Sequence, residues 1–435
     1  MVRRFIVFLV FIFFLNSEAE KFRGIEQYKL ENDVTVIFVD TAWSNSLLVM
    51  LCVSAGSSDE IEKRGVANLL AHLFARKLRE SVGEDLARTE AENNVFVGHD
   101  QSIFYLVGRR ENLDLFIRGL GSTFSGGAFP VESIKECQQY ISKKNQGQIS
   151  DKASIREEVM RSLYWHSPYG IPVEGNSKAQ STLTKTDLKE FTEACYLNEK
   201  ATIIIVGNVD KNATKQLILR NFPNKEMREW QTRERLQEPS HHGSTVRITK
   251  QSQQVRLPIL ELYWRIPVYR KNAKQAVAAE IFVNHLMEIL PDILVELLRI
   301  ASSISFYYSF WNSDDGEVCI SITLREKDAR KIDQAILAVT TEIKNISSNG
   351  ISEEQARKAA KKLSDSANVF TSNTDEVDVV DWLAKKIGAG YDLNFLKSYV
   401  DFVNKFDLKE INEQAKEIFK KDPSVVSIVT PQKTI

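Results

Sequence analysis

Both halves of this chain end with the same short pattern, an Asp-Leu-Lys-Glu helix start followed by an apolar strand. The first copy begins at Asp187 and leads to the apolar run Thr202–Val206. The second begins at Asp407, 220 residues later in a chain of 435, and leads to Val425–Val429. A repeat of this kind is typical of a chain that builds two similar units, each around its own core. We therefore predict an α+β fold made of two similar halves.

Apolar spacing predicts the secondary structure of each half. In the first half it indicates strands at 27–30, 34–39, 46–53, 95–97, 103–107 and 201–206, and helices at 64–80, 111–122, 131–144, 155–163 and 186–196. In the second half it indicates strands at 257–264, 303–311, 317–324 and 425–429, and helices at 273–290, 293–300 and 326–347. A polar, charged stretch separates them. The predicted organisation is a first half at 20–230, a linker at 231–245 and a second half at 246–435.

The N-terminus has the three regions of a secretory signal peptide. Arg3 and Arg4 precede the apolar run Phe5–Leu15, and a cleavage position follows at Ala19. The run holds eleven residues, whereas a helix needs about 20 to cross a membrane. A retained anchor and an apolar core helix are the alternatives to a signal. We expect residues 1–19 to be removed and the mature protein to be periplasmic or secreted, without membrane association.

Charge and cysteine spacing argue against several classes of protein. A formal net charge of −1 gives no electrostatic reason to bind nucleic acid or an anionic membrane. The four cysteines lie far apart without a C-x-x-C pair, so they do not predict a thiolate metal site. Cys52 and Cys319 lie in apolar runs, where we expect buried thiols, although export would permit disulfides. The isolated pair His99-Asp100 is typical of a solvated turn.

Several short motifs occur in the order and spacing of one known family. They are Val53–Ser57, Gly65–Ala67, Ala71–Phe74, the Ser167–Gly170 turn with Gly175, and the strand with its Gly-Asn-Val end at Thr202–Asp210. Together they resemble the insulinase and mitochondrial processing peptidase family, also called the pitrilysin family, over nearly the whole mature chain. The resemblance implies that family's metallohydrolase fold, in which each half is a mostly antiparallel sheet packed with helices.

The resemblance also shows where this chain departs from the family's zinc site. The family uses H-x-x-E-H on a helix, with two zinc-binding histidines and a glutamate base, and a second glutamate downstream. Here Asn68 replaces the first histidine and Ala71 the base, and only His72 is kept. Ungapped alignment places Lys143 and Lys144 at the downstream acidic pair, and an ammonium group repels zinc. We therefore expect no zinc, no other cofactor and no catalytic residue, with His72 as a hydrogen-bonded core histidine.

A second part of the family's site is changed as well. In the family, a glycine-rich loop precedes a segment whose arginine and tyrosine contact the substrate. By the same resemblance these two positions are Ser302 and Phe306 here, while an upstream arginine is kept as Arg299. Positions 244–315 hold no glycine, so the loop is absent. Tyr308 could share the strand face of Phe306, because side chains alternate along a strand.

Three functions remain open. Family members often work in pairs, so a degenerate chain could partner or regulate an active zinc-peptidase relative, which would cover apolar surface on a concave inner face between the halves. Alternatively the chain could act alone and bind extended peptides by strand addition. The third reading is an active zinc metalloendopeptidase with altered ligands. The edge strand expected to bind peptides comprises Asn94, Val95, Phe96, Val97 and Gly98.

Overall fold

The computed structural model describes residues 24–40, 46–60, 63–89, 91–125, 129–148, 151–175, 177–225, 244–309, 316–325, 330–367, 387, 391 and 393–432. The predicted signal at 1–19 and all but the last two residues of the predicted linker lie outside these ranges. Among the helices that are described, none is both long enough and apolar enough to cross a membrane.

The first half forms a six-stranded sheet. Its strands are β1 (Gly24–Lys29), β2 (Thr35–Asp40), β3 (Ser46–Val53), β4 (Glu92–Val97), β5 (Ser102–Arg109) and β6 (Ala201–Val206). Their spatial order is β1-β2-β6-β3-β5-β4. β2 and β6 are parallel, and the other neighbouring pairs are antiparallel. The predicted strands at 27–30 and 34–39 form the β1–β2 hairpin, whose turn holds Asp33 at a φ of 63°.

The second half forms a five-stranded sheet with the same arrangement. Its strands are β7 (Val246–Ser252), β8 (Ile259–Ile266), β9 (Ala301–Ser309), β10 (Gly316–Leu324) and β11 (Val425–Pro431), in the order β7-β11-β8-β10-β9. The last strand of each half, β6 or β11, lies between one parallel and one antiparallel neighbour. A hairpin, β4–β5 or β9–β10, forms one edge of each sheet. This matching topology confirms the predicted pair of similar, mostly antiparallel halves.

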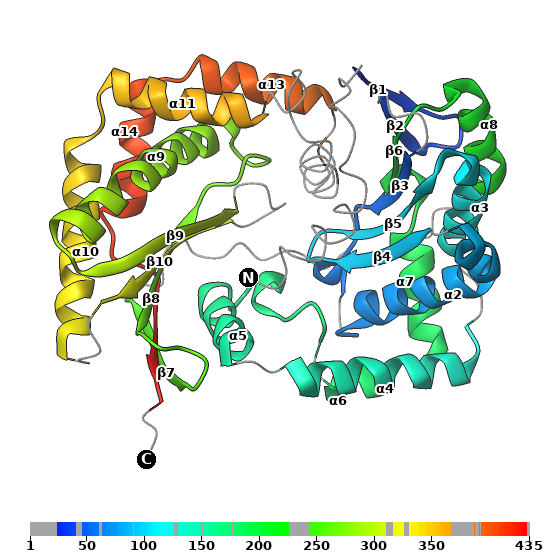
Figure 1. Ribbon diagram of the computed structural model, residues 1–435, viewed down its shortest axis with the longest axis horizontal. Coiled ribbons are helices and arrows are strands. Elements are labelled where there is room, and N and C mark those ends of the chain that lie inside the picture. Colours follow the sequence, from blue (N-terminus) through cyan, green and yellow to red (C-terminus); the bar gives the residue numbers. More distant parts are fainter. Residues whose placement is uncertain are drawn as a thin grey trace.

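Helices cover one face of each sheet, and Figure 1 shows the two helical layers toward opposite ends of the molecule. In the first half these helices are α2 (Val66–Thr89), α3 (Leu113–Phe124), α4 (Val131–Gln148), α6 (Ser177–Ser181), α7 (Lys185–Cys195) and α8 (Lys211–Asn221). In the second half they are α9 (Ala273–Pro291), a π-helical turn (Asp292–Leu297), α10 (Arg330–Asn349), α11 (Glu353–Ala367), α13 (Leu393–Asn404) and α14 (Leu408–Phe419). A separate apolar core lies under each layer.

The other face of each sheet is covered by an element from the opposite half. Helix α5 (Asp151–Leu163) belongs to the first half but packs on β7 and β11 of the second sheet, where Val159 shares a buried cluster with Tyr263. In return, Ile387 and Leu393 of the second half are buried against the first sheet. The expectation of an open apolar face between the halves was therefore wrong for these described side chains, because the crossing elements bury them.

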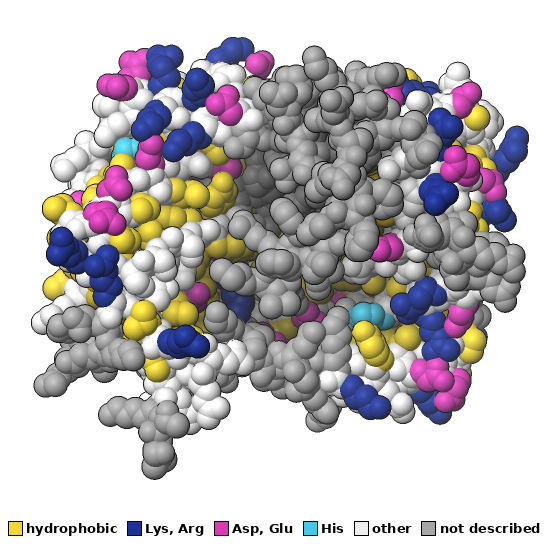
Figure 2. Space-filling model, in the orientation of Figure 1, with side chains coloured by type: hydrophobic (Ala, Val, Ile, Leu, Met, Phe, Trp, Pro, Cys, Tyr) yellow, Lys and Arg dark blue, Asp and Glu magenta, His cyan; other side chains and the backbone are white. Residues whose placement is uncertain are grey.

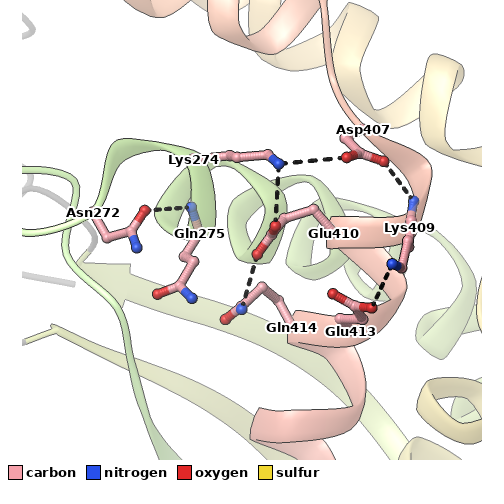
Figure 3. Close-up of polar contacts among 8 residues, drawn as sticks. All are labelled: Asn272, Lys274, Gln275, Asp407, Lys409, Glu410, Glu413 and Gln414. Carbon is pink, nitrogen blue, oxygen red and sulfur yellow. Dashed lines mark hydrogen bonds and ion pairs between the residues drawn. The ribbon is translucent and has the colours of Figure 1, made fainter.

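The repeated Asp-Leu-Lys-Glu segments start their helices in different ways. Asp407 is the N-cap of α14, and Lys274 lies 3.4 Å from both Asp407 and Glu410, as Figure 3 shows. In α7 the N-cap is Thr184, and the Asp187 carboxylate accepts a hydrogen bond from the Thr184 backbone N–H at 2.7 Å. The sequence repeat thus marks equivalent helices, although the caps of these helices differ in position by three residues.

Candidate functional site

Helix α2, which carries the motif positions, begins at a buried carboxylate. Glu60 is 1% exposed, and its two side-chain oxygens accept the backbone N–H groups of Gly65 at 2.8 Å and Ala67 at 2.9 Å. Burial raises the pKa of Glu60 to about 8, although the two backbone hydrogen bonds act in the opposite direction. Glu60 therefore supplies acceptors to N–H groups that the first turn of a helix leaves without an intrahelical partner.

Glycines allow two neighbouring turns to approach the start of α2. Gly65 and Gly175 have φ values of +86° and +64°, a region that favours glycine. A Cβ on Gly175 would lie 3.0 Å from the Gly65 backbone, so the two turns are in direct contact. On the other side, a Cβ on Gly56 would lie 2.4 Å from the carbonyl oxygen of Gly98. Several residues that carry the family resemblance therefore position α2.

The pair His99-Asp100 belongs to the contacts around the start of α2. It is not a solvated turn, which corrects the expectation from sequence. The Ser57 hydroxyl lies 2.9 Å from His99 Nδ1, and Ser58 donates to Asp100 at 3.2 Å. The hydroxyl of Tyr169, from the Ser-Pro-Tyr-Gly turn, donates to the other Asp100 oxygen. Burial lowers the pKa of His99, which favours a neutral imidazole in this network.

The motif positions lie where α2 packs on α4. Asn68 is 8% exposed and Ala71 is fully buried, whereas His72 is only half-buried, so the expectation of a core histidine was too strong. The His72 ring meets the Tyr140 ring edge-on, with centroids 5.7 Å apart. Asn68 Nδ2 has no hydrogen-bond partner among the described residues. Lys143 is exposed.

The packing register relates the two lysines to the motif. His72 contacts Tyr140, and one turn later on α2 Arg76 pairs with Glu136, one turn earlier on α4. The two helices therefore run antiparallel, and the same register places the backbone of residue 144 near that of Asn68. Sequence reasoning missed Tyr140, although its position four residues before Lys144 could have placed it on the same helix face.

These residues do not fit a zinc ion as the family would hold it. Within the described ranges, no group of three or more His, Cys, Asp or Glu side chains could hold a metal ion. At the motif itself, Ala71 offers no donor atom, and an asparagine with one histidine is short of the three protein ligands of a catalytic zinc site. That the protein contains no zinc remains a prediction.

The second set of changed positions lies on β9, in the other sheet. Ser302 is exposed and its hydroxyl donates to the Thr323 carbonyl oxygen at 3.1 Å. Phe306 and Tyr308 pack against the second core, whereas Tyr307 is 51% exposed. This alternation confirms that Tyr308 shares the face of Phe306, and it turns both rings toward the helices.

The two halves each present an edge strand. β4, which contains the predicted peptide-binding residues Asn94 to Val97, ends the first sheet and packs on α2, and β9 ends the second sheet. Phe96 is 49% exposed. Figure 2 shows apolar side chains gathered over the part of the second half where Figure 1 places β9 and α9. Exposed apolar side chains of the second half include Met287 and Leu297, at 36% and 76% exposure.

An ion pair between a part-exposed arginine and a buried glutamate links the halves, and sequence reasoning did not find it. Arg156 on α5 lies 3.1 Å from the Glu317 carboxylate on β10, which is 2% exposed. The Tyr164 hydroxyl donates to the other Glu317 oxygen, and Arg156 donates to the Tyr263 hydroxyl at 3.3 Å. The guanidinium also lies over the Tyr307 ring, 4.9 Å from its centroid. Partners this distant in sequence leave no local pattern to read.

Comparisons with known proteins agree with this architecture. The family model described as "Peptidase M16 inactive domain" matches residues 182–363. An uncharacterized zinc protease of Rickettsia felis is 27% identical over 188 residues, 42% of this chain and 46% of that protein. The mitochondrial-processing peptidase subunit beta of Saccharomyces cerevisiae is 21% identical over 216 residues, 48% of this chain and 46% of that protein. Each matched stretch thus spans about half the length of the relative.

The fold has solved counterparts. The crystal structure of a protease from Helicobacter pylori superposes with a TM-score of 0.77 at 18% identity, and covers 94% of this chain and 100% of that chain. At this level of identity the match concerns the fold. Taken together, the family model, the relatives and the duplicated sheet-and-helix fold support the resemblance of this chain to the insulinase/pitrilysin family of M16 peptidases.

Proposed function

We propose that this protein is an exported, non-catalytic subunit of the insulinase/pitrilysin family that partners or regulates an active zinc-peptidase relative in peptide processing or degradation. One observation carries the proposal. The frame of the motif helix is intact, with Glu60 and two close glycine turns at its start, while Asn68 and Ala71 occupy the positions of a ligand and the base. A chain that keeps the contacts that position this helix, but lacks the residues that would bind zinc and act as the base, is suited to assembly rather than to cleavage.

Relatives support the pairing part of the proposal. The yeast relative is named as a subunit, and that name implies a protein that works within an assembly. In our proposal this chain forms one half of the assembly. An intact relative forms the other half and holds the metal. Export is proposed from Arg3, Arg4 and the apolar run Phe5–Leu15.

Coexpression tests the partnership. The chain would be produced with the nearest relative from the same genome that has an intact H-x-x-E-H, followed by size exclusion and cleavage of a quenched peptide. We expect one complex that contains both chains, with an interface of at least about 1,000 Å². We also expect the partner's activity to fall when this chain is omitted. Separate elution of the two chains at micromolar concentration, with unchanged partner activity, would contradict the proposal.

A stand-alone peptide-binding module is the second candidate, and the position of β4 at a sheet edge favours it. An extended peptide could add to this strand through backbone hydrogen bonds, which require no catalytic residue. Binding of an extended peptide by the isolated chain, without any effect on a partner, would favour this reading. An active peptidase with rearranged ligands is the third candidate, and a metal analysis separates it from both.

A further inference from the structure

The changed motif positions place hydrogen-bond donors together where α2 meets α4. Asn68 and His72 are four residues apart on α2 and therefore share one face, and Tyr140 and Lys143 are three apart on α4. The contact between the His72 and Tyr140 rings brings the two faces together. We call Asn68, His72, Tyr140 and Lys143 the donor patch, and the register places the backbone of Lys144 beside it.

Two independent features give the donor patch a preference for an acceptor. Asn68 Nδ2 is buried without a hydrogen-bond partner among the described residues, and a buried unsatisfied donor is costly. Lysines at 143 and 144 bring positive charge to the same end of α4. Glu136, one turn away on α4, already pairs with Arg76, which also binds Glu80, and Glu60 at the start of α2 accepts two backbone N–H groups.

We propose that the donor patch binds a carboxylate of an extended peptide lying along β4. Helix α2 packs on β4, so a peptide added to that edge would run along the strand that packs on the helix carrying Asn68 and His72. The carboxylate would accept hydrogen bonds from the Asn68 amide and from Lys143, and a charge-assisted bond of the second kind belongs to the stronger class. The inference rests on the proposed non-catalytic role, because it requires a motif position that does not hold zinc.

Three fluorescein-labelled decapeptides of one alternating Val-Thr sequence would test this by anisotropy with the purified chain. One has a free C-terminal carboxylate, one has an amidated C-terminus, and one is amidated with a central Asp. We expect about tenfold tighter binding of at least one carboxylate-bearing peptide than of the neutral one. A preference for the first identifies a peptide C-terminus as the source of the carboxylate, and a preference for the third identifies an acidic side chain.

A matched pair of double variants assigns the effect to this site. Lys143→Glu with Lys144→Glu should abolish the preference, whereas Lys420→Glu with Lys421→Glu, an adjacent exposed pair after α14, should leave it intact. Unchanged melting temperatures control for folding. Equal affinity for the three peptides, no binding of any of them, or a preference that survives the first double variant would overturn the inference. Coexpression tests the partnership and does not depend on the result with the peptides. The failure of one proposal can therefore be told from the failure of the other.

Discussion

Glu60 shows how a single side chain keeps the motif helix in place. Its carboxylate lies in the core and binds two backbone N–H groups at the start of α2, so the helix is fixed at the turn that precedes Asn68. Because burial opposes the charged form, the pKa of Glu60 is raised from 4.5 to about 8. The folded state therefore binds a proton that the unfolded chain releases at lower pH.

The raised pKa predicts a pH-dependent contribution to stability. The contribution of Glu60 is fully present below pH 4.5 and is lost as pH rises through about 8, with a slope of up to about 1.4 kcal/mol per pH unit. Glu60→Gln, which resembles the protonated side chain, should remove this slope. Urea unfolding of both proteins at pH 6 and pH 9 measures it. Parallel changes in the two free energies of unfolding would show that Glu60 is ionised throughout.

The residues at the motif positions within α2 could be predicted from sequence. The residues that contact them from other elements could not. Asn68, Ala71 and His72 lie within one helix, and their spacing along it is what predicts a degenerate motif. Tyr140 contacts His72 from another helix; its spacing from Lys144 places both on one face of α4, but the sequence does not say which helix that face meets. His99-Asp100 was misread for the same reason, because Tyr169 approaches it from a distant turn.

At the scale of elements, α5 is one of the two described crossings that join the halves. It leaves its own sheet and packs on β7 and β11 of the other. Arg156 and Tyr164 both bind Glu317, so the carboxylate is buried with two partners from the first half.

Arg156→Met should destabilise the protein by about 3 kcal/mol, because it leaves the buried Glu317 carboxylate without its cation. The matched control is Lys250→Met, which breaks the 2.8 Å pair with Glu158 across the same boundary but at 45% and 44% exposure. The control should cost less than about 1 kcal/mol. Denaturant unfolding gives both values, and equal costs would contradict a special role for the Arg156–Glu317 pair.

The glycine turns beside α2 provide a second test at this scale. Gly175→Ala should cost about 1–2 kcal/mol, because its φ is +64° and the new Cβ would meet the Gly65 backbone. Gly98→Ala is the control, since its nearest neighbours lie 3.4 Å or more from the new Cβ and are side-chain atoms. Melting temperatures of both variants measure the difference. If Gly98→Ala were the more damaging change, the close approach of the two turns would not be the important constraint.

At the scale of the whole molecule, the sequence predicted the duplication but not how the halves join. The repeated helix and strand predicted two similar units, and the matching strand orders confirm them. The crossing of α5 and of Ile387 and Leu393 could not be predicted, because an amphipathic element shows that it is half-buried but not against which sheet. Among the described residues, the crossing elements bury the apolar side chains on the sheet faces that were expected to attract a partner, and the exposed strand edges that a proposed partner could use include β4 and β9.

The zinc content of the purified protein tests the central claim most directly. After export, purification and dialysis against metal-free buffer, elemental analysis would be set against protein concentration from amino-acid analysis. Because Asn68 and Ala71 replace a ligand and the base, and lysines occupy the downstream acidic positions, the account predicts zinc far below one ion per chain. A content of about one zinc per chain, lost together with chelator-sensitive peptide cleavage, would contradict it.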